Sequence, residues 1–148
     1  MSLRENEMKY NLERFKIAQE RSYAYALAEI RNGRKVSHWM WYVFPQIAGL
    51  GRSSTAEYYS ISCLDEAREY LADEVLGERL IEISSALLEL NTNDAETVMG
   101  FPDCLKLRSS MTLFSVASGG KKVFNDVIAK YYGGEPDERT LEIIKAPS

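Results

Sequence analysis

The sequence HWMWYVFPQ, residues 38–46, holds the chain's only histidine, both of its tryptophans and a proline. The residues from Trp39 to Phe44 are all large and apolar or aromatic, so the segment has no polar face in any regular period. We therefore expect the other elements to surround it. A helix from about Ser37 to Val43 should stop at Phe44, because a residue before proline is pushed out of helical geometry.

A strand is the alternative for this segment, because it is rich in aromatic and β-branched residues. However, we find no second segment of matching length with which it could pair. Elsewhere the apolar residues recur at helical spacing, most clearly in Leu76, Leu80, Ile83 and Leu87. The sequence thus predicts an all-α, multi-helical fold of about eight or nine short helices.

The chain has 148 residues, a length that suits a single domain. We expect a flexible N-terminus over residues 1–10 and one helical domain over residues 11–145, since no repeat or linker composition interrupts it. The domain should begin with two helices, the first over residues 11–19 and the second capped by Ser22.

The composition is that of a globular protein, with 45% hydrophobic and 27% charged residues. No apolar run is long enough to span a bilayer and no signal-peptide pattern opens the chain, so we expect a cytoplasmic protein without a membrane partner. The formal net charge of -4 argues against nucleic acid as a partner, because phosphate binding needs an excess of Lys and Arg. The sequence sets no oligomeric state.

Metal and cofactor sites are not expected. Cys63, Cys104 and His38 are too few for a zinc site, and they lack the close spacing of ligand pairs. The segment Gly49-Leu50-Gly51 matches neither a dinucleotide fingerprint nor a P-loop.

The aromatic segment contains the first candidate site residues. His38 is the candidate catalytic residue, because an imidazole can act as an acid or a base near neutral pH. The alternative is a buried histidine bonded to a backbone carbonyl, since no neighbouring residue forms a recognisable dyad with it. Trp39 and Trp41 either belong to the core or offer a surface on which a planar ligand such as a nucleobase can stack.

Two other segments supply candidate binding residues. Arg52 follows two glycines and precedes a helix, an arrangement that either cradles an anion or forms a purely structural turn. Lys106, Ser109 and Ser110 lie on one helix face beside an apolar stripe. They form either ordinary surface or the polar wall of a pocket.

Several motifs together resemble an uncharacterised family of bacterial proteins that is catalogued as a domain of unknown function. The likeness runs from Asn11 to Ile144. It rests on residues 38–46, Leu50-Gly51-Arg52-Ser53, the stretch DCLKLRSSMTLF at residues 103–114, and Tyr132-Gly133-Gly134 ahead of Asp137, Thr140 and Leu141.

The resemblance implies an all-helical single domain and no assigned catalytic residue. Some members of the family carry a calpastatin label. We set that label aside, because a calpain inhibitor of that kind is disordered and built from repeats, whereas this chain is compact and unrepeated.

The leading hypothesis is a domain that binds a small anionic or nucleotide-like metabolite in a cleft between the aromatic segment and the helix of Lys106. A second hypothesis is an enzyme that uses His38 on such a ligand, with Lys106 or Arg52 holding the anion. A third is a protein–protein interaction module without a small ligand, which would use Tyr58, Tyr59, Tyr131 and Tyr132 at a dimer or partner surface.

Overall fold

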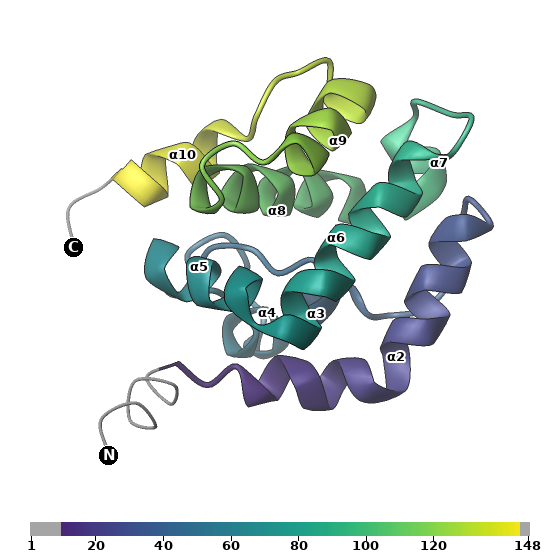
Figure 1. The fold of residues 1–148 in the computed structure, drawn as a ribbon. Helices are drawn as coiled ribbons and strands as arrows, with labels where there is room; N and C mark the ends of the chain where they lie inside the picture. Colours follow the sequence, from purple (N-terminus) through teal and green to yellow (C-terminus); the bar gives the residue numbers. More distant parts are fainter. Residues whose placement is uncertain (1–9, 146–148) are drawn as a thin grey trace.

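The computed structural model describes residues 10–145, so the predicted flexible N-terminus lies outside it except for Tyr10. The described residues form nine α-helices and no β-strand (Figure 1), which confirms the all-α prediction. The helices are α2 (Glu13–Arg31), α3 (Met40–Val43), α4 (Ser54–Tyr58), α5 (Leu64–Ala72), α6 (Glu74–Leu88), α7 (Ala95–Met99), α8 (Asp103–Ala117), α9 (Lys122–Tyr132) and α10 (Glu138–Lys145).

The prediction of two helices at the start of the domain is wrong. Helix α2 runs unbroken through both segments. Between them lie only Glu20 and Arg21, which are good helix formers. The hydroxyl of Ser22 does not cap a second helix, because it forms a 2.8 Å hydrogen bond with the hydroxyl of Tyr42.

The aromatic segment is helical, but its helix α3 is shorter than predicted. The chain becomes helical only at Met40, and it leaves helical geometry at Phe44 (φ -125°, ψ 71°), directly before Pro45 as expected. The strand alternative is therefore wrong for this segment. Its most buried side chains, each at most 2% exposed, are Trp39, Met40, Val43 and Phe44, so the other elements do surround it.

Helix α6 occupies the middle of the fold, with α2 on one side and α8 and α9 on the other (Figure 1). Its predicted apolar stripe is buried, and the carboxylate of Asp73 caps its first turn by accepting hydrogen bonds from Val75 N and Leu76 N. Gly77 allows the close approach of α5, since a Cβ there would lie 2.1 Å from the carbonyl oxygen of Leu71. Residues 71–77 thus form a tight α5–α6 corner.

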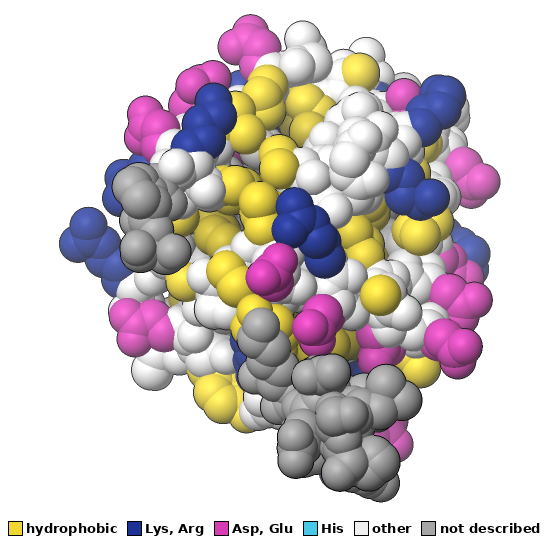
Figure 2. Space-filling view, turned by 60° about the vertical axis from the view of Figure 1, so that its left-hand side comes forward, with side chains coloured by type: hydrophobic (Ala, Val, Ile, Leu, Met, Phe, Trp, Pro, Cys, Tyr) yellow, Lys and Arg dark blue, Asp and Glu magenta, His cyan; other side chains and the backbone are white. Residues whose placement is uncertain are grey.

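Helix α8 packs against α5, α7, α9 and α10, and its first turns lie near the aromatic segment. None of the described helices has both the length and the apolar character needed to cross a membrane. On the face shown in Figure 2, Lys and Arg side chains are interspersed with Asp and Glu, and hydrophobic side chains reach the surface between them. Neither sign of charge dominates that face.

Candidate functional site

Trp39 is a packing residue. Its ring is 1% exposed, and its indole N–H donates a 2.9 Å hydrogen bond to the carboxylate of Glu29. The same carboxylate accepts hydrogen bonds from the backbone N–H groups of Val36 (2.7 Å) and Ser37 (2.9 Å). Burial raises the pKa of Glu29, but the hydrogen bonds from Ser37, Val36 and Trp39 outweigh it and lower the pKa to about 2.

Lys35 ties the loop before α3 to the start of α8. Its side chain is 7% exposed, and its ammonium lies 2.8 Å from the carboxylate of Asp103. The ammonium also donates to the carbonyl of Ser37 at 2.6 Å and lies 4.9 Å from the ring centre of Trp39. With its charge and its donors occupied in this way, Lys35 serves the fold.

Trp41 and Lys106 come together from the two most distinctive motifs. The ammonium of Lys106 lies 5.9 Å from the ring centre of the half-buried Trp41. It lies 3.6 Å from Asp103, farther than Lys35 does, and its side chain is 30% exposed. The three charged groups carry one net positive charge, and Lys106 is the more accessible and more loosely paired of the two cations.

His38 is exposed at the turn before α3, so the interpretation as a buried packing histidine is wrong. Within the described residues its imidazole makes no hydrogen bond or ion pair. Its backbone carbonyl accepts a long 3.4 Å hydrogen bond from the hydroxyl of Tyr42. An imidazole without an orienting partner lacks the arrangement that general bases commonly have.

The glycines before Arg52 form a structural turn. A Cβ at Gly51 would lie 2.5 Å from the Cβ of Ala56, so this glycine is needed for close packing against α4. The side chain of Ser53 caps α4, because its hydroxyl accepts a 3.1 Å hydrogen bond from Ala56 N, the third amide of the helix. Arg52 is exposed on this turn, and no contact among the described residues joins it to Trp41 or Lys106.

Ser109 points away from the aromatic segment. Its hydroxyl donates to the carbonyl of Leu105 (3.3 Å) and lies 3.1 Å from the carboxylate of Asp137, the residue before α10. Thr112, on the next turn of α8, also contacts the segment before α10, since its hydroxyl accepts a 2.8 Å hydrogen bond from the N–H of Asp137. Arg108 donates to the carbonyl of Glu135 at 2.8 Å. Much of this motif therefore holds the α9–α10 connection.

Ser110, the next residue on α8, differs from Ser109 in its surroundings. Its side chain is fully buried, and its hydroxyl has no hydrogen-bond partner. Adjacent positions on a helix point in directions about 100° apart, so the two serines face different neighbours. The structure thus brings Trp41 and Lys106 together, and Ser110 lies one turn along α8 from Lys106. Trp39 and Ser109 make their hydrogen bonds within the fold, and Arg52 is exposed.

The sequence matches the family described as "Protein of unknown function (DUF1810)" over residues 9–144. The chain belongs to this family. The predicted resemblance to an uncharacterised family is therefore confirmed. The structure is similar to the crystal structure of the conserved hypothetical protein Rv1873 from Mycobacterium tuberculosis, with 44% sequence identity and a TM-score of 0.91. The similarity covers 93% of this chain and 99% of that chain. A comparison with curated proteins finds no match.

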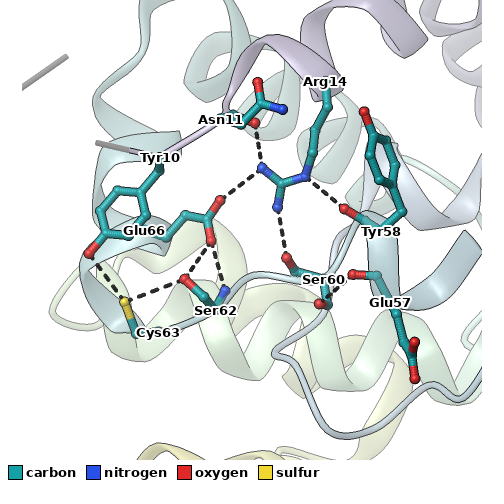
Figure 3. Close-up of polar contacts among 9 residues, drawn as sticks. All are labelled: Tyr10, Asn11, Arg14, Glu57, Tyr58, Ser60, Ser62, Cys63 and Glu66. Carbon is teal, nitrogen blue, oxygen red and sulfur yellow. Dashed lines mark hydrogen bonds and ion pairs between the residues drawn. The ribbon is translucent and has the colours of Figure 1, made fainter. Parts of the chain in front are cut away.

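One buried ion pair of this DUF1810 chain was missed by the sequence analysis. Arg14 and Glu66 are 3.0 Å apart, with side chains 9% and 3% exposed (Figure 3). The guanidinium also donates to the carbonyls of Asn11, Tyr58 and Ser60, and the other oxygen of Glu66 accepts from the N–H and hydroxyl of Ser62. Every partner lies within the protein, so the pair joins α2, α4 and α5 and leaves nothing to bind a ligand.

Cys63 stands beside this pair at the start of α5 (Figure 3). Its half-buried thiol lies 3.4 Å from the hydroxyl of Tyr10 and 3.7 Å from that of Ser62. Burial raises the pKa of the thiol, but the hydrogen bond with Tyr10 and those with Glu66 and Ser62 lower it below its ordinary value. The buried Cys104, by contrast, has a raised pKa because of its burial.

Two hollows of the DUF1810 fold lie elsewhere than at the predicted site. One of about 600 Å³ is lined by residues 10–13, Lys16, Glu69, Ala72 and Asp73. The other, of about 280 Å³, lies between α8, α9 and α10 and is lined by Thr112, Ser115, Val116, Asn125, Ile128, Gly134, Pro136 and Leu141. Neither contains a predicted site residue, so Trp41 and Lys106 meet outside these two hollows.

The tyrosines of the interaction hypothesis are not all available. Tyr58 is 57% exposed, whereas Tyr131 is 8% exposed and donates to the carbonyl of Leu87. Tyr132 is half-buried, and its hydroxyl donates to the carbonyl of Cys104. They do not form one exposed aromatic surface. Among residues 10–145 there is also no group of three or more His, Cys, Asp or Glu side chains placed to hold a metal ion.

Proposed function

We propose that this protein binds a small anionic molecule with a planar part, such as a nucleotide, where Trp41 of α3 meets Lys106 of α8. The observation that carries the proposal is the position of the Lys106 ammonium, 5.9 Å from the ring centre of the half-buried Trp41. An aromatic face beside a cation offers stacking to a planar group and a charge-assisted hydrogen bond to an anion.

The local charge supports an anionic ligand. Asp103 pairs closely with Lys35 at 2.8 Å, and its distance to Lys106 is 3.6 Å. Lys106 is also the more exposed lysine, with 30% of its side chain accessible against 7% for Lys35. An incoming phosphate or carboxylate can therefore pair with Lys106 without removing a partner from the buried Lys35.

We propose binding and not catalysis. His38 is exposed, and no contact among the described residues joins its imidazole to Trp41 or Lys106. Its imidazole has no carboxylate or hydroxyl partner among the described residues, and nothing else at this position resembles an activated nucleophile.

Tryptophan fluorescence tests the proposal, because Trp39 is sealed at 1% exposure and Trp41 is half-buried. We expect AMP to quench part of the emission of the wild-type protein, and we expect Trp41→Phe to remove that quenching. Glucose 6-phosphate and NAD are tested beside AMP to compare ligands with and without a planar base.

The matched pair of variants is Lys106→Gln and Lys122→Gln. Lys122 is an exposed helical lysine that pairs with a carboxylate on its own helix, as Lys106 does, but it lies on α9 and its pair with Asp126 is closer, at 2.7 Å. Lys106→Gln should weaken AMP binding about tenfold, the loss typical of one charge-assisted hydrogen bond. Lys122→Gln should leave it unchanged. Equal affinities for AMP in both variants would contradict the proposal.

A further inference from the structure

The hydroxyl of Ser110 is the one buried side-chain oxygen or nitrogen without a hydrogen-bond partner in the described chain, and its residue is 0% exposed. A serine or threonine inside a helix commonly donates to the carbonyl four residues earlier. On the same helix Ser109 donates to Leu105 in this way, and Thr112 donates to Arg108. The hydroxyl of Ser110 does not form the corresponding hydrogen bond with the carbonyl of Lys106.

Ser110 lies on the stripe of α8 that faces the candidate site. Lys106 precedes it by one turn and Phe114 follows it by one turn, so the three side chains share a face. Lys106 contacts Trp41 of α3, and the ring of Phe114 lies 5.2 Å from that of Tyr70 in α5. Its helical position thus places Ser110 between a residue that contacts α3 and a residue that contacts both α5 and α9, since the ring of Phe114 also lies 6.1 Å from that of Phe124.

The side chains of Lys106 and Trp41 are loosely held. The 5.9 Å between Lys106 and Trp41 is at the outer limit of a cation–π contact, about 6 Å. The ion pair of Lys106 with Asp103 is long at 3.6 Å. No hydrogen bond holds the indole N–H of Trp41 to another described residue. Displacing these two side chains removes few interactions.

We infer that Ser110 is a binding residue, whose hydroxyl forms a hydrogen bond with a polar group of the ligand that enters between Lys106 and Trp41. This inference rests on the proposed function. Because Lys106 and Ser110 are four residues apart on α8, about 6 Å along the axis, the ligand carries its polar group at a similar distance from its anionic group. A nucleoside phosphate meets this requirement, and inorganic phosphate does not.

An unpartnered buried hydroxyl destabilises the free protein and gains its hydrogen bond only in the complex. Replacing it therefore has two effects of opposite sign. Ser110→Ala should raise the melting temperature of the ligand-free protein by about 2–4 °C. The same change should weaken AMP binding about tenfold, since one hydrogen bond is lost.

The control is Ser84→Ala in α6. Ser84 is also 0% exposed, but its hydroxyl has a partner in the sulfur of Met111 at 3.7 Å. This variant should not raise the melting temperature and should bind AMP as the wild type does. The affinity of Ser110→Ala for inorganic phosphate should also equal that of the wild type, because phosphate reaches Lys106 only.

The outcomes separate the two proposals. Unchanged AMP affinity in Ser110→Ala, while Lys106→Gln still loses affinity, would overturn the role of Ser110 alone. A loss of AMP affinity with a lower melting temperature would also overturn it, because the serine would then be structural. Failure of both AMP and NAD to quench the wild-type protein would overturn the proposed function itself.

Discussion

Arg14 and Lys106 are both cations beside aromatic rings, 4.3 Å from the ring centre of Phe15 and 5.9 Å from that of Trp41, yet they differ in how many protein groups pair with them. Arg14 has a carboxylate and three carbonyls as acceptors, and it is 9% exposed. Lys106 has a distant carboxylate and one ring, and it is 30% exposed. A charge whose partners all belong to the protein stabilises the fold. An exposed charge that is only loosely paired with protein groups can bind a ligand.

The largest difference between the two regions should appear when each cation is removed. Arg14→Ala leaves the carboxylate of Glu66, 3% exposed, without its cation. We expect the free energy of unfolding to fall by about 3–5 kcal/mol and the melting temperature by about 10 °C.

Chemical unfolding followed by circular dichroism measures the loss at Arg14. The control is Arg68→Ala, which removes an exposed ion pair with Asp65 at 3.1 Å, with side chains 54% and 64% exposed. That change should lower stability by less than about 1 kcal/mol. Similar losses in the two variants would show that burial does not strengthen the Arg14–Glu66 pair.

An intermediate effect is expected at Glu29, which supports the candidate site from within the fold. Glu29→Gln replaces a carboxylate that accepts hydrogen bonds from Val36, Ser37 and Trp39. The amide has one acceptor oxygen and turns an NH₂ group toward donors. We expect a loss of about 2 kcal/mol, because these are hydrogen bonds to a charged group.

The pH dependence follows from the lowered pKa of Glu29. The folded protein holds the pKa at about 2, whereas the ordinary value is 4.5, so the stabilisation is present above pH 4.5 and is lost as the pH falls toward 2. Stability measured over this range should fall less steeply in Glu29→Gln than in the wild type. Parallel curves would show that the carboxylate contributes nothing in this range.

The smallest effect on stability is expected at Lys106. Its partners are a carboxylate at 3.6 Å and a ring at 5.9 Å, so Lys106→Gln should change the free energy of unfolding by less than about 1 kcal/mol. Thermal unfolding gives this value directly. A loss as large as that of Arg14→Ala would place Lys106 among the groups that hold the fold together.

The sequence predicts the fold well where one periodicity dominates. The stripe of Leu76, Leu80 and Ile83 defines α6, and Pro45 ends α3 as expected. The continuous α2 was not predicted, because Ser22 is a common capping residue and its true partner, Tyr42, comes from a different helix. Arg14 and Glu66 gave no signal, since each stands in a helix as an ordinary charged residue until the tertiary fold buries it.

The candidate site was predicted only in part for the same reason. Trp39 and Trp41 belong to one apolar run, so the sequence does not show which of the two rings is buried. In the structure Trp39 is buried, and its indole N–H is bonded to the carboxylate of Glu29 in the preceding helix. Ser109 and Ser110 are neighbours in sequence, and only the placement of Asp137 shows that the first belongs to the α9–α10 connection. The sequence analysis expected a cleft between the two motifs, and the structure shows the Lys106 ammonium 5.9 Å from the ring centre of Trp41.

Nuclear magnetic resonance of the two indole N–H groups tests the central proposal most directly, because one group reports on the site and the other on the fold. The N–H of Trp39 is bonded to Glu29 in the core, whereas Trp41 lies beside Lys106. On titration with AMP, we predict that the Trp41 resonance shifts in a saturable way while the Trp39 resonance stays in place. A Trp41 resonance that does not move at millimolar AMP, or two resonances that shift together, would contradict a binding site at Trp41 and Lys106.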